Sequence, residues 1–229
     1  MNIPCTCIVG RFICEEKNRF LCTVEVDGAQ KRCYIASSCR LDNFVNLKGK
    51  TVLLTPVTNP KASTEYAVLA VRHKRSYILL NTAMANRAVE NSIHSKKLSC
   101  FGKRKNVSRE HKVESYKTDF YLFESKTIIE VKSVISATED ALFPTVFSER
   151  TMRQLSEIDK MLSSGYLARL VIVSLNPYVK QIRIQNNDPF YSALRKCIDR
   201  GLEIDAFTCR LGQDGNPYID KKIPVIYPS

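Results

Sequence analysis

The sequence predicts a two-domain α/β protein in which a small β-barrel, residues 1–80, precedes an α/β sandwich with a mixed central sheet, residues 81–229. Three observations support this fold class. In the first 80 residues, short alternating apolar runs are separated by turn residues, and no helix of normal length fits. At Asn81-Thr82 the apolar spacing becomes helical. Beyond this point the predicted order is helix, three strands, helix, strand, helix and strand, which is typical of helices packed on one sheet.

Basic and aromatic residues are interleaved in the barrel domain, which holds 12 Lys and Arg against 6 Asp and Glu. We predict strands at residues 20–26, 31–35, 51–56 and 66–71. Rings that stack on bases and cations that meet phosphates indicate single-stranded or distorted nucleic acid as the ligand. The predicted binding residues are Arg11, Arg19, Phe20 and Arg40. The alternative is that the rings form core and the charges form a solvated face.

The second domain begins with a helix through Met84 and Ile93, capped by Asn81 or Thr82. The connection that follows, residues 94–112, holds 7 Lys and Arg against one Glu, whereas the rest of residues 81–229 has 16 of each sign. We interpret it as an exposed loop that contacts phosphate, and a merely solvated loop is the alternative. Its predicted binding residues are Lys103, Arg104 and Lys105. A short strand near residues 112–115 follows.

Two strands joined at Glu124-Ser125 carry the candidate chemistry. A period of two places one apolar set on one face, namely Phe120, Leu122, Ile129 and Val131, and one charged set on the other, namely Lys117, Asp119, Glu130 and Lys132. In this register Asp119 faces Glu130, and Lys117 faces Lys132. Opposed residues have Cβ atoms about 4.5 to 5.5 Å apart. The two carboxylates therefore raise each other's proton affinity unless a cation lies between them, and a divalent metal is the natural cation.

The remaining elements continue the alternation of helix and strand. A loop containing Glu139 to Pro144 leads to a helix that starts near Ser148. Residues 167–175 form a largely buried strand, a second helix follows Asp188-Pro189, and residues 202–207 form the last strand. Asp188 is the expected cap of that helix, and Pro189 is its expected first-turn residue.

Composition narrows the classes of protein that remain. A formal net charge of +12 points to a polyanionic partner, with solubility alone as the alternative. The sequence shows no signal peptide and no apolar run long enough to cross a bilayer, so we expect a soluble cytoplasmic protein without a membrane partner. The nine cysteines form no Cys-x-x-Cys pair, which indicates reduced thiols rather than a zinc site.

An ordered set of segments spans both domains: Gly10-Arg-Phe12, Asn18-Arg-Phe20, Asn59-Pro-Lys61, Asn81-Thr82 with Asn86 and Glu90, Thr118-Asp-Phe120, Ile129-Glu-Val-Lys-Ser133 and Ala141-Leu-Phe-Pro-Thr-Val-Phe-Ser-Glu-Arg150. Together they resemble the sugar fermentation stimulation protein A family, which pairs an OB-like barrel with a PD-(D/E)xK restriction-endonuclease-like domain. The chain departs from the family at Ala36-Ser-Ser-Cys-Arg40, where the family has Pro-Asn-Ser/Thr-Gly-Arg, and at Gln154, where it tends to carry His.

The resemblance implies a DNA-binding phosphodiesterase that depends on a divalent metal, with DNA preferred over RNA. Asp119 and Glu130 would hold Mg²⁺ or Mn²⁺. Lys132 would orient a water or neutralise developing charge, and Glu90 would complete the metal shell or serve a second ion. Arg150 and Lys117 would contact phosphate. The oligomeric state is open between a monomer and a homodimer.

A function without catalysis is the alternative. The family's name reflects a role in sugar use, so the chain could be a DNA-binding transcriptional regulator of sugar metabolism that keeps the nuclease fold as a scaffold. A purely structural explanation is an exposed ion pair between Asp119 and Lys132. Such a pair contributes only about 0 to 1 kcal/mol, so stability would not require it.

Overall fold

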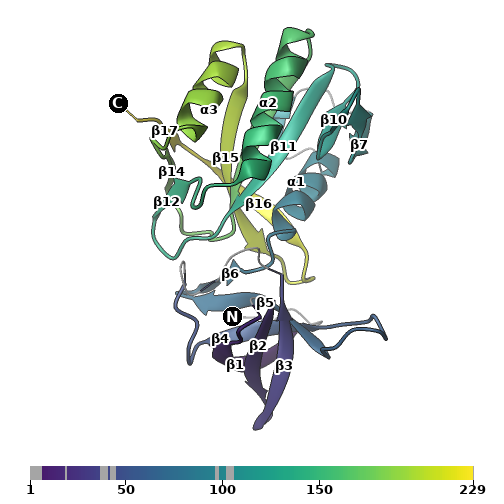
Figure 1. The fold of residues 1–229 in the computed structure, drawn as a ribbon. Helices are drawn as coiled ribbons and strands as arrows, with labels where there is room; N and C mark the ends of the chain where they lie inside the picture. Colours follow the sequence, from purple (N-terminus) through teal and green to yellow (C-terminus); the bar gives the residue numbers. More distant parts are fainter. Residues whose placement is uncertain are drawn as a thin grey trace.

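The first domain is a closed barrel, shown at the bottom of Figure 1. The computed structural model describes residues 7–18, 20–36, 41, 45–95, 98–101 and 106–228. The barrel strands are β1 (Ile8–Glu15), β2 (Leu21–Val26), β3 (Ala29–Ile35), β4 (Thr51–Pro56) and β5 (Tyr66–His73). They pair in the order β3-β2-β1-β4-β5, and β3 also pairs with β5, which closes the barrel. The small barrel predicted from the sequence is thereby confirmed.

Local sequence explains how the barrel strands turn and cross. Asp27 and Gly28 both have positive φ, 51° and 78°, and form the tight turn between β2 and β3. Because this turn takes only two residues, β3 starts at Ala29 rather than at the predicted residue 31. Gly10 lets β1 cross close to β2, since a Cβ there would lie 2.5 Å from Cγ1 of Val24. Two strands of this sheet were not predicted: β1 and β6 (Ser76–Leu79), which pairs with β5.

The second domain is built on one mixed six-stranded sheet in the order β16-β15-β13-β11-β10-β7. The central strands are parallel, namely β11 (Thr127–Val134), β13 (Leu167–Ser174) and β15 (Glu203–Leu211). The flanking strands are antiparallel, namely β7 (Val107–Arg109), β10 (Phe120–Leu122) and β16 (Pro217–Ile223). Helices α2 (Glu149–Ser163) and α3 (Phe190–Asp199) cover one face, and α1 (Met84–His94) packs against the other (Figure 1). This is the predicted α/β sandwich.

Shorter elements surround the sheet and correct several predictions. The strand predicted near residues 112–115 is β8 (Lys112–Val113), which pairs with β9 (Tyr116–Lys117) in a separate two-stranded sheet. The sheet neighbour of β10 is instead β7. The predicted loop before α2 contains β12 (Asp140–Phe143), which forms a small parallel sheet with β14 (Gln181–Ile184) and β17 (Val225–Ile226). A short 3-10 helix, η2 (Ser99–Phe101), lies between α1 and β7.

Helix starts follow the predicted capping chemistry only in part. Ser148 caps α2, because its side chain accepts the backbone N–H of Thr151. Ala83 occupies the cap position of α1. The side-chain oxygen of Asn81, two residues earlier, accepts the backbone N–H of Ala83. Pro189 occupies the cap position of α3 rather than its first turn, so that prediction was wrong by one position.

Two hydrophobic clusters fill the two faces of the sheet. The first lies under α2 and α3, with Leu155 and Leu194 among its buried members. The second lies under α1 and continues into the barrel interior, so Ile129 and Val52 belong to one cluster. The N–H of Leu79 donates to the carbonyl of Leu175, 3.0 Å away, which joins the barrel to the end of β13. The α1 face of the sheet and the barrel interior therefore share one hydrophobic core.

Candidate active site

The predicted hairpin register is confirmed. Phe120 pairs with Ile129, and Leu122 pairs with Thr127, so Asp119 stands next in register to Glu130. The loop is longer than predicted, because the paired residues end at Leu122 and resume at Thr127. Phe120 and Ile129 are buried on the α1 face, as the period of two predicts. The register therefore places both carboxylates at the same end of the hairpin.

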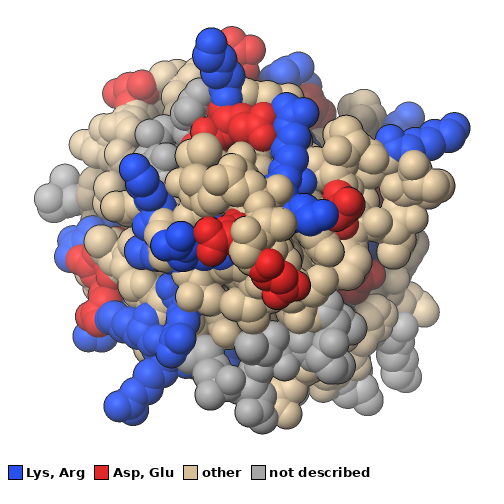
Figure 2. Space-filling model, turned by 90° about the horizontal axis from the view of Figure 1, so that it is seen from below, with Lys and Arg blue, Asp and Glu red and all other residues tan. Residues whose placement is uncertain are grey.

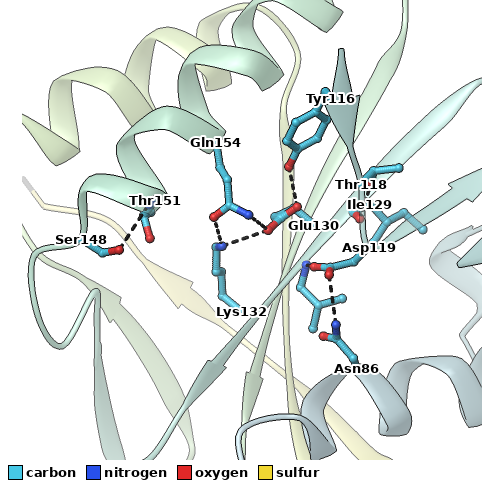
Figure 3. Close-up of polar contacts among 11 residues, drawn as sticks. Asn86, Tyr116, Thr118, Asp119, Ile129, Glu130, Lys132, Ser148, Thr151 and Gln154 are labelled. Carbon is cyan, nitrogen blue, oxygen red and sulfur yellow. Dashed lines mark hydrogen bonds and ion pairs between the residues drawn. The ribbon is translucent and has the colours of Figure 1, made fainter. Parts of the chain in front are cut away.

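Two donors from different elements hold Asp119. Its Oδ2 accepts the backbone N–H of Val131, 2.8 Å away, and its Oδ1 accepts the side-chain amide of Asn86 on α1, 3.0 Å away (Figure 3). The preceding residue, Thr118, is buried and donates its hydroxyl to the carbonyl of Ile129, 2.8 Å away. These contacts fix the carboxylate just outside the β10–β11 ladder.

Glu130 lies at the centre of a buried hydrogen-bond network. It is 4% exposed and accepts the hydroxyl of Tyr116, 2.5 Å away, and the ammonium group of Lys132, 2.9 Å away. The amide nitrogen of Gln154, on α2, also donates to Glu130, and the amide oxygen of Gln154 accepts from Lys132 (Figure 3). Lys132 thus pairs with Glu130 rather than with Asp119, which corrects the ion pair considered from the sequence.

These side chains open onto a cavity of about 390 Å³. Its lining comes from four parts of the fold: Asn86 on α1, Asp119 beside β10, Glu130 and Lys132 on β11, and Gln154 on α2. Residues of the segment between β12 and α2 also line the cavity. Arg150, the predicted phosphate contact, lines it as well. The structure therefore brings Asp119, Glu130, Lys132 and Arg150 to one solvent-accessible site.

The electrostatics of the site favour an added cation. Burial raises the pKa of Glu130 above its usual range; Lys132 lowers it, and the nearby Asp119 carboxylate raises it. Burial also raises the pKa of Tyr116, with Glu130 adding to the effect, so the phenol stays protonated and donates. A positive ion in the cavity would offset the free-energy cost of burying the charged Glu130 carboxylate.

The donor set fits a hard divalent cation. Carboxylate oxygens suit Mg²⁺ or Mn²⁺, and Mg²⁺ usually takes only one or two carboxylates and keeps several waters. Within the described ranges, no group of three or more His, Cys, Asp and Glu side chains is arranged to hold a metal. The two available carboxylates, Asp119 and Glu130, match a site completed by water and substrate rather than a closed protein cage.

Two other predicted residues lie outside the cavity. Glu90 is one turn along α1 from Asn86, but it pairs with Arg109, 2.9 Å away, and does not line the cavity. Lys117 does not face Lys132, because β9 pairs with β8 and places Lys117 opposite Lys112. Its ammonium group contacts Glu110 at 2.5 Å, and both side chains are exposed. The prediction of the Lys117 register was wrong.

The predicted nucleic-acid contacts of the barrel are only partly described. Arg11 is exposed and pairs with Glu25, and Phe20 stacks on Tyr34 with ring centroids 6.4 Å apart. Seen from the barrel end, basic side chains are spread among acidic ones rather than gathered in one patch (Figure 2). The other predicted contacts, Arg19, Arg40, Lys103, Arg104 and Lys105, lie outside the described residues.

Sequence reasoning missed three residues of the site. Tyr116 reaches it from β9, which lies outside the β10–β11 hairpin, and Asn86 reaches it from α1. Gln154 was noted only as a departure from a family pattern, yet it contacts both Glu130 and Lys132. Its position near the start of α2, one turn after the cavity residue Arg150, was the available signal.

Family models match both domains. The sugar fermentation stimulation protein RE domain matches residues 83–215, and the SfsA N-terminal OB domain matches residues 15–80.

In the described residues, no helix combines the length and the apolar character needed to cross a membrane.

Known proteins resemble the chain over most of its length. A sugar fermentation stimulation protein homolog of Methanococcoides burtonii is 33% identical and covers 82% of this chain and 80% of its own. Another, of Desulfitobacterium hafniense DCB-2, is 25% identical and covers 90% of each chain. The solved structure of Pyrococcus furiosus SfsA in complex with Ca²⁺ matches the fold with a TM-score of 0.83, at 22% identity over 98% of this chain and 97% of that one. On this evidence the chain belongs to the sugar fermentation stimulation protein family.

Proposed function

We propose that the chain is a divalent-metal-dependent phosphodiesterase that acts on DNA, or alternatively on RNA. One observation carries the proposal: Asp119, Glu130 and Lys132 line the same cavity, with the Glu130 carboxylate almost fully buried. Buried carboxylates that open onto a cavity and have perturbed pKa values are typical of catalytic sites. Mg²⁺ or Mn²⁺ bound by Asp119 and Glu130 would polarise the scissile phosphate and lower the pKa of a water.

The residues of the chain supply positioning and charge. Lys132 is held by Glu130 and Gln154, so its ammonium group is oriented before substrate enters. Asn86 and the Val131 N–H fix Asp119, and Tyr116 holds the far oxygen of Glu130. Arg150 is exposed at the cavity and is free to contact a substrate phosphate.

Three further observations support a metal-dependent action on nucleic acid. The fold relative from Pyrococcus furiosus was solved in complex with Ca²⁺, a hard cation of the class that this donor set suits. The net charge of +12 favours a polyanionic substrate, and the exposed stacked rings of Phe20 and Tyr34 offer a surface for bases on the barrel. Six of the described cysteines carry free thiols, which agrees with action in the cytoplasm: Cys14, Cys22, Cys33, Cys100, Cys197 and Cys209.

The test is a cleavage assay with supercoiled plasmid and short single-stranded DNA and RNA, with Mg²⁺ or Mn²⁺ or with a chelator. We expect cleavage by the wild type with metal, and a loss of about 100-fold or more for Asp119→Ala and for Lys132→Ala. Glu203→Gln, an exposed carboxylate outside the cavity, is the control and should retain the rate. Intact substrates in every reaction would contradict the proposed phosphodiesterase activity.

One observation favours the alternative of a regulator that binds DNA without cutting it. Both carboxylates and Lys132 already form hydrogen bonds within the protein, as expected of a site kept for its shape. A retardation assay separates the two functions. Binding that falls steeply with salt, with no cleavage under any metal, would support the regulator.

A further inference from the structure

The segment between β12 and α2 leaves two large apolar side chains in solvent beside the cavity. Pro144, Thr145, Val146 and Ser148 line the cavity. Val146 is 46% exposed and Phe147 is 61% exposed, the largest fraction among the exposed large hydrophobic side chains of the described residues. A ring left in water forgoes the free energy that its burial would provide, and apolar surface beside a cavity often marks a contact surface.

Both ends of this segment are anchored, so the ring stands on a fixed support. Phe143 is buried, and its carbonyl accepts the backbone N–H of Gln185, 2.8 Å away. The side chain of Gln185 donates to the carbonyl of Pro144. At the other end, Ser148 caps α2 by accepting the N–H of Thr151, 3.3 Å away. A preorganised support of this kind lowers the entropy cost of binding a ligand.

The charges next to the ring complete the pattern. Arg150 lies in the first turn of α2, lines the same cavity and is exposed. It forms no ion pair with any residue in the part of the chain that the structure describes. Deeper in the cavity lie Lys132 and the two carboxylates. The cavity therefore presents a free guanidinium group and a candidate metal site, and the exposed ring of Phe147 belongs to the segment beside it. These three features match a phosphate, the reacting phosphate and a base of a nucleotide chain.

We propose that Phe147, flanked by Val146, receives the face of an unstacked nucleobase next to the scissile phosphate, while Arg150 contacts that phosphate or its neighbour. This inference rests on the proposed function and names its substrate class. Bases inside a continuous duplex have both faces covered, so only single-stranded or locally unpaired nucleic acid offers a face to the ring. Every base has such a face, so the site discriminates little between bases at this position.

The test measures binding of the full chain in the presence of a chelator, so that cleavage does not interfere. The probes are a labelled short single strand of DNA, the same strand with abasic residues throughout, and the intact duplex. We expect Phe147→Ala to weaken binding of the intact single strand by about tenfold and Phe147→Tyr to leave it near the wild-type value. Phe147→Ala should not change binding of the abasic strand, which has no base to stack. Phe123→Ala is the matched control, because Phe123 is 45% exposed but belongs to the loop between β10 and β11 rather than to the segment beside the cavity.

Three results would overturn the inference: equal losses for the intact and abasic strands, an equal loss for Phe123→Ala, or a wild type that binds the duplex more tightly than the single strand. Cleavage with Mg²⁺, measured in parallel, keeps the two proposals distinguishable. Ring-dependent binding without cleavage would retain the base platform and reject the nuclease. Cleavage of single strands that Phe147→Ala leaves unchanged would reject the platform and retain the nuclease. Absence of binding to all three probes would reject both.

Discussion

Two clusters of buried charge lie on the same sheet and differ in their charge balance. At the cavity, the two carboxylates are Asp119 and Glu130, and Lys132, which contacts Glu130, is the one cation paired with either of them among the described residues. On the α1 face, Asp205 of β15 is 4% exposed and contacts Arg169 of β13 and Lys222 of β16, the latter at 2.6 Å. Arg169 also contacts Glu203, which is largely exposed. The second cluster does not line the cavity.

The difference shows how a structural charge cluster can be told from a functional one. Around Asp205, two carboxylates meet two cations, and the charges cancel. At the cavity, two carboxylates meet one ammonium group, which leaves one negative charge uncompensated in contact with solvent. Burial of an uncompensated charge is costly, so the cavity cluster is the one that gains from an added cation.

The largest expected effect tests the balanced cluster. Asp205→Ala removes the carboxylate that neutralises Arg169 and Lys222, and should lower the free energy of unfolding by about 3 to 5 kcal/mol. Urea denaturation measures this change, with Glu203→Gln, a 65% exposed side chain, as the control expected to lose at most about 1 kcal/mol. If the two variants are equally stable, the Asp205 cluster has no structural role of this size.

The cavity cluster, unlike the balanced Asp205 cluster, should be stabilised by an added metal ion. At a Mg²⁺ concentration of about 100 times the dissociation constant, binding to the native state raises the free energy of unfolding by about 2.7 kcal/mol. Asp119→Asn should lose this gain, because it removes a charged ligand. Denaturation at matched ionic strength, with and without Mg²⁺, measures both effects. An equal gain in Asp119→Asn and in the wild type would contradict the metal site.

The register of the site could be predicted because it depends on neighbouring residues of one hairpin. A period of two and a single short turn suffice to oppose Asp119 and Glu130. The same reasoning failed for Lys117, because it assumed that the strand continues through Thr118. Thr118 instead turns its hydroxyl onto the carbonyls of Phe120 and Ile129, so the chain before it forms a different hairpin.

The remaining site residues come from other elements and depend on how the chain packs in three dimensions. Asn86, Tyr116 and Gln154 meet the carboxylates only because α1, β9 and α2 surround the same end of the sheet (Figure 3). Leu155 and Ile158 of α2 recur at helical spacing and are buried, but this periodicity assigns no partner to a polar residue such as Gln154. Glu90 illustrates the same limit, since Arg109, a residue of β7, determines where its carboxylate lies.

A smaller effect is expected at one of the missed residues. Tyr116→Phe removes the hydroxyl that donates to the buried Glu130 carboxylate, and should lower the free energy of unfolding by about 2 kcal/mol. The gain on adding Mg²⁺ should remain, because both carboxylates remain. Tyr121→Phe is the matched control, since Tyr121 is also buried but its hydroxyl has no hydrogen-bond partner among the described residues. Equal losses in both variants would show that the contact with Glu130 contributes nothing specific.

The smallest effect concerns His73, a half-buried group whose charged neighbours are cations. Its Nε2 atom is buried without a hydrogen-bond partner in the described part of the chain, and its ring packs edge-on against Tyr178 at 5.8 Å. Burial lowers the pKa of His73, and Lys74 and Lys50 lower it further.

Because the pKa of His73 is lower in the folded than in the unfolded chain, the unfolded chain binds the proton more readily. The contribution of His73 to stability is therefore present above the unfolded pKa of about 6.5 and is lost as the pH falls through the folded value. We expect His73→Gln to lose less free energy of unfolding than the wild type between about pH 7 and about pH 5. Urea denaturation at the two pH values measures this difference, with His94→Gln, an exposed histidine, as the control. The same pH dependence in His73→Gln and in the wild type would show that protonation of His73 does not oppose folding.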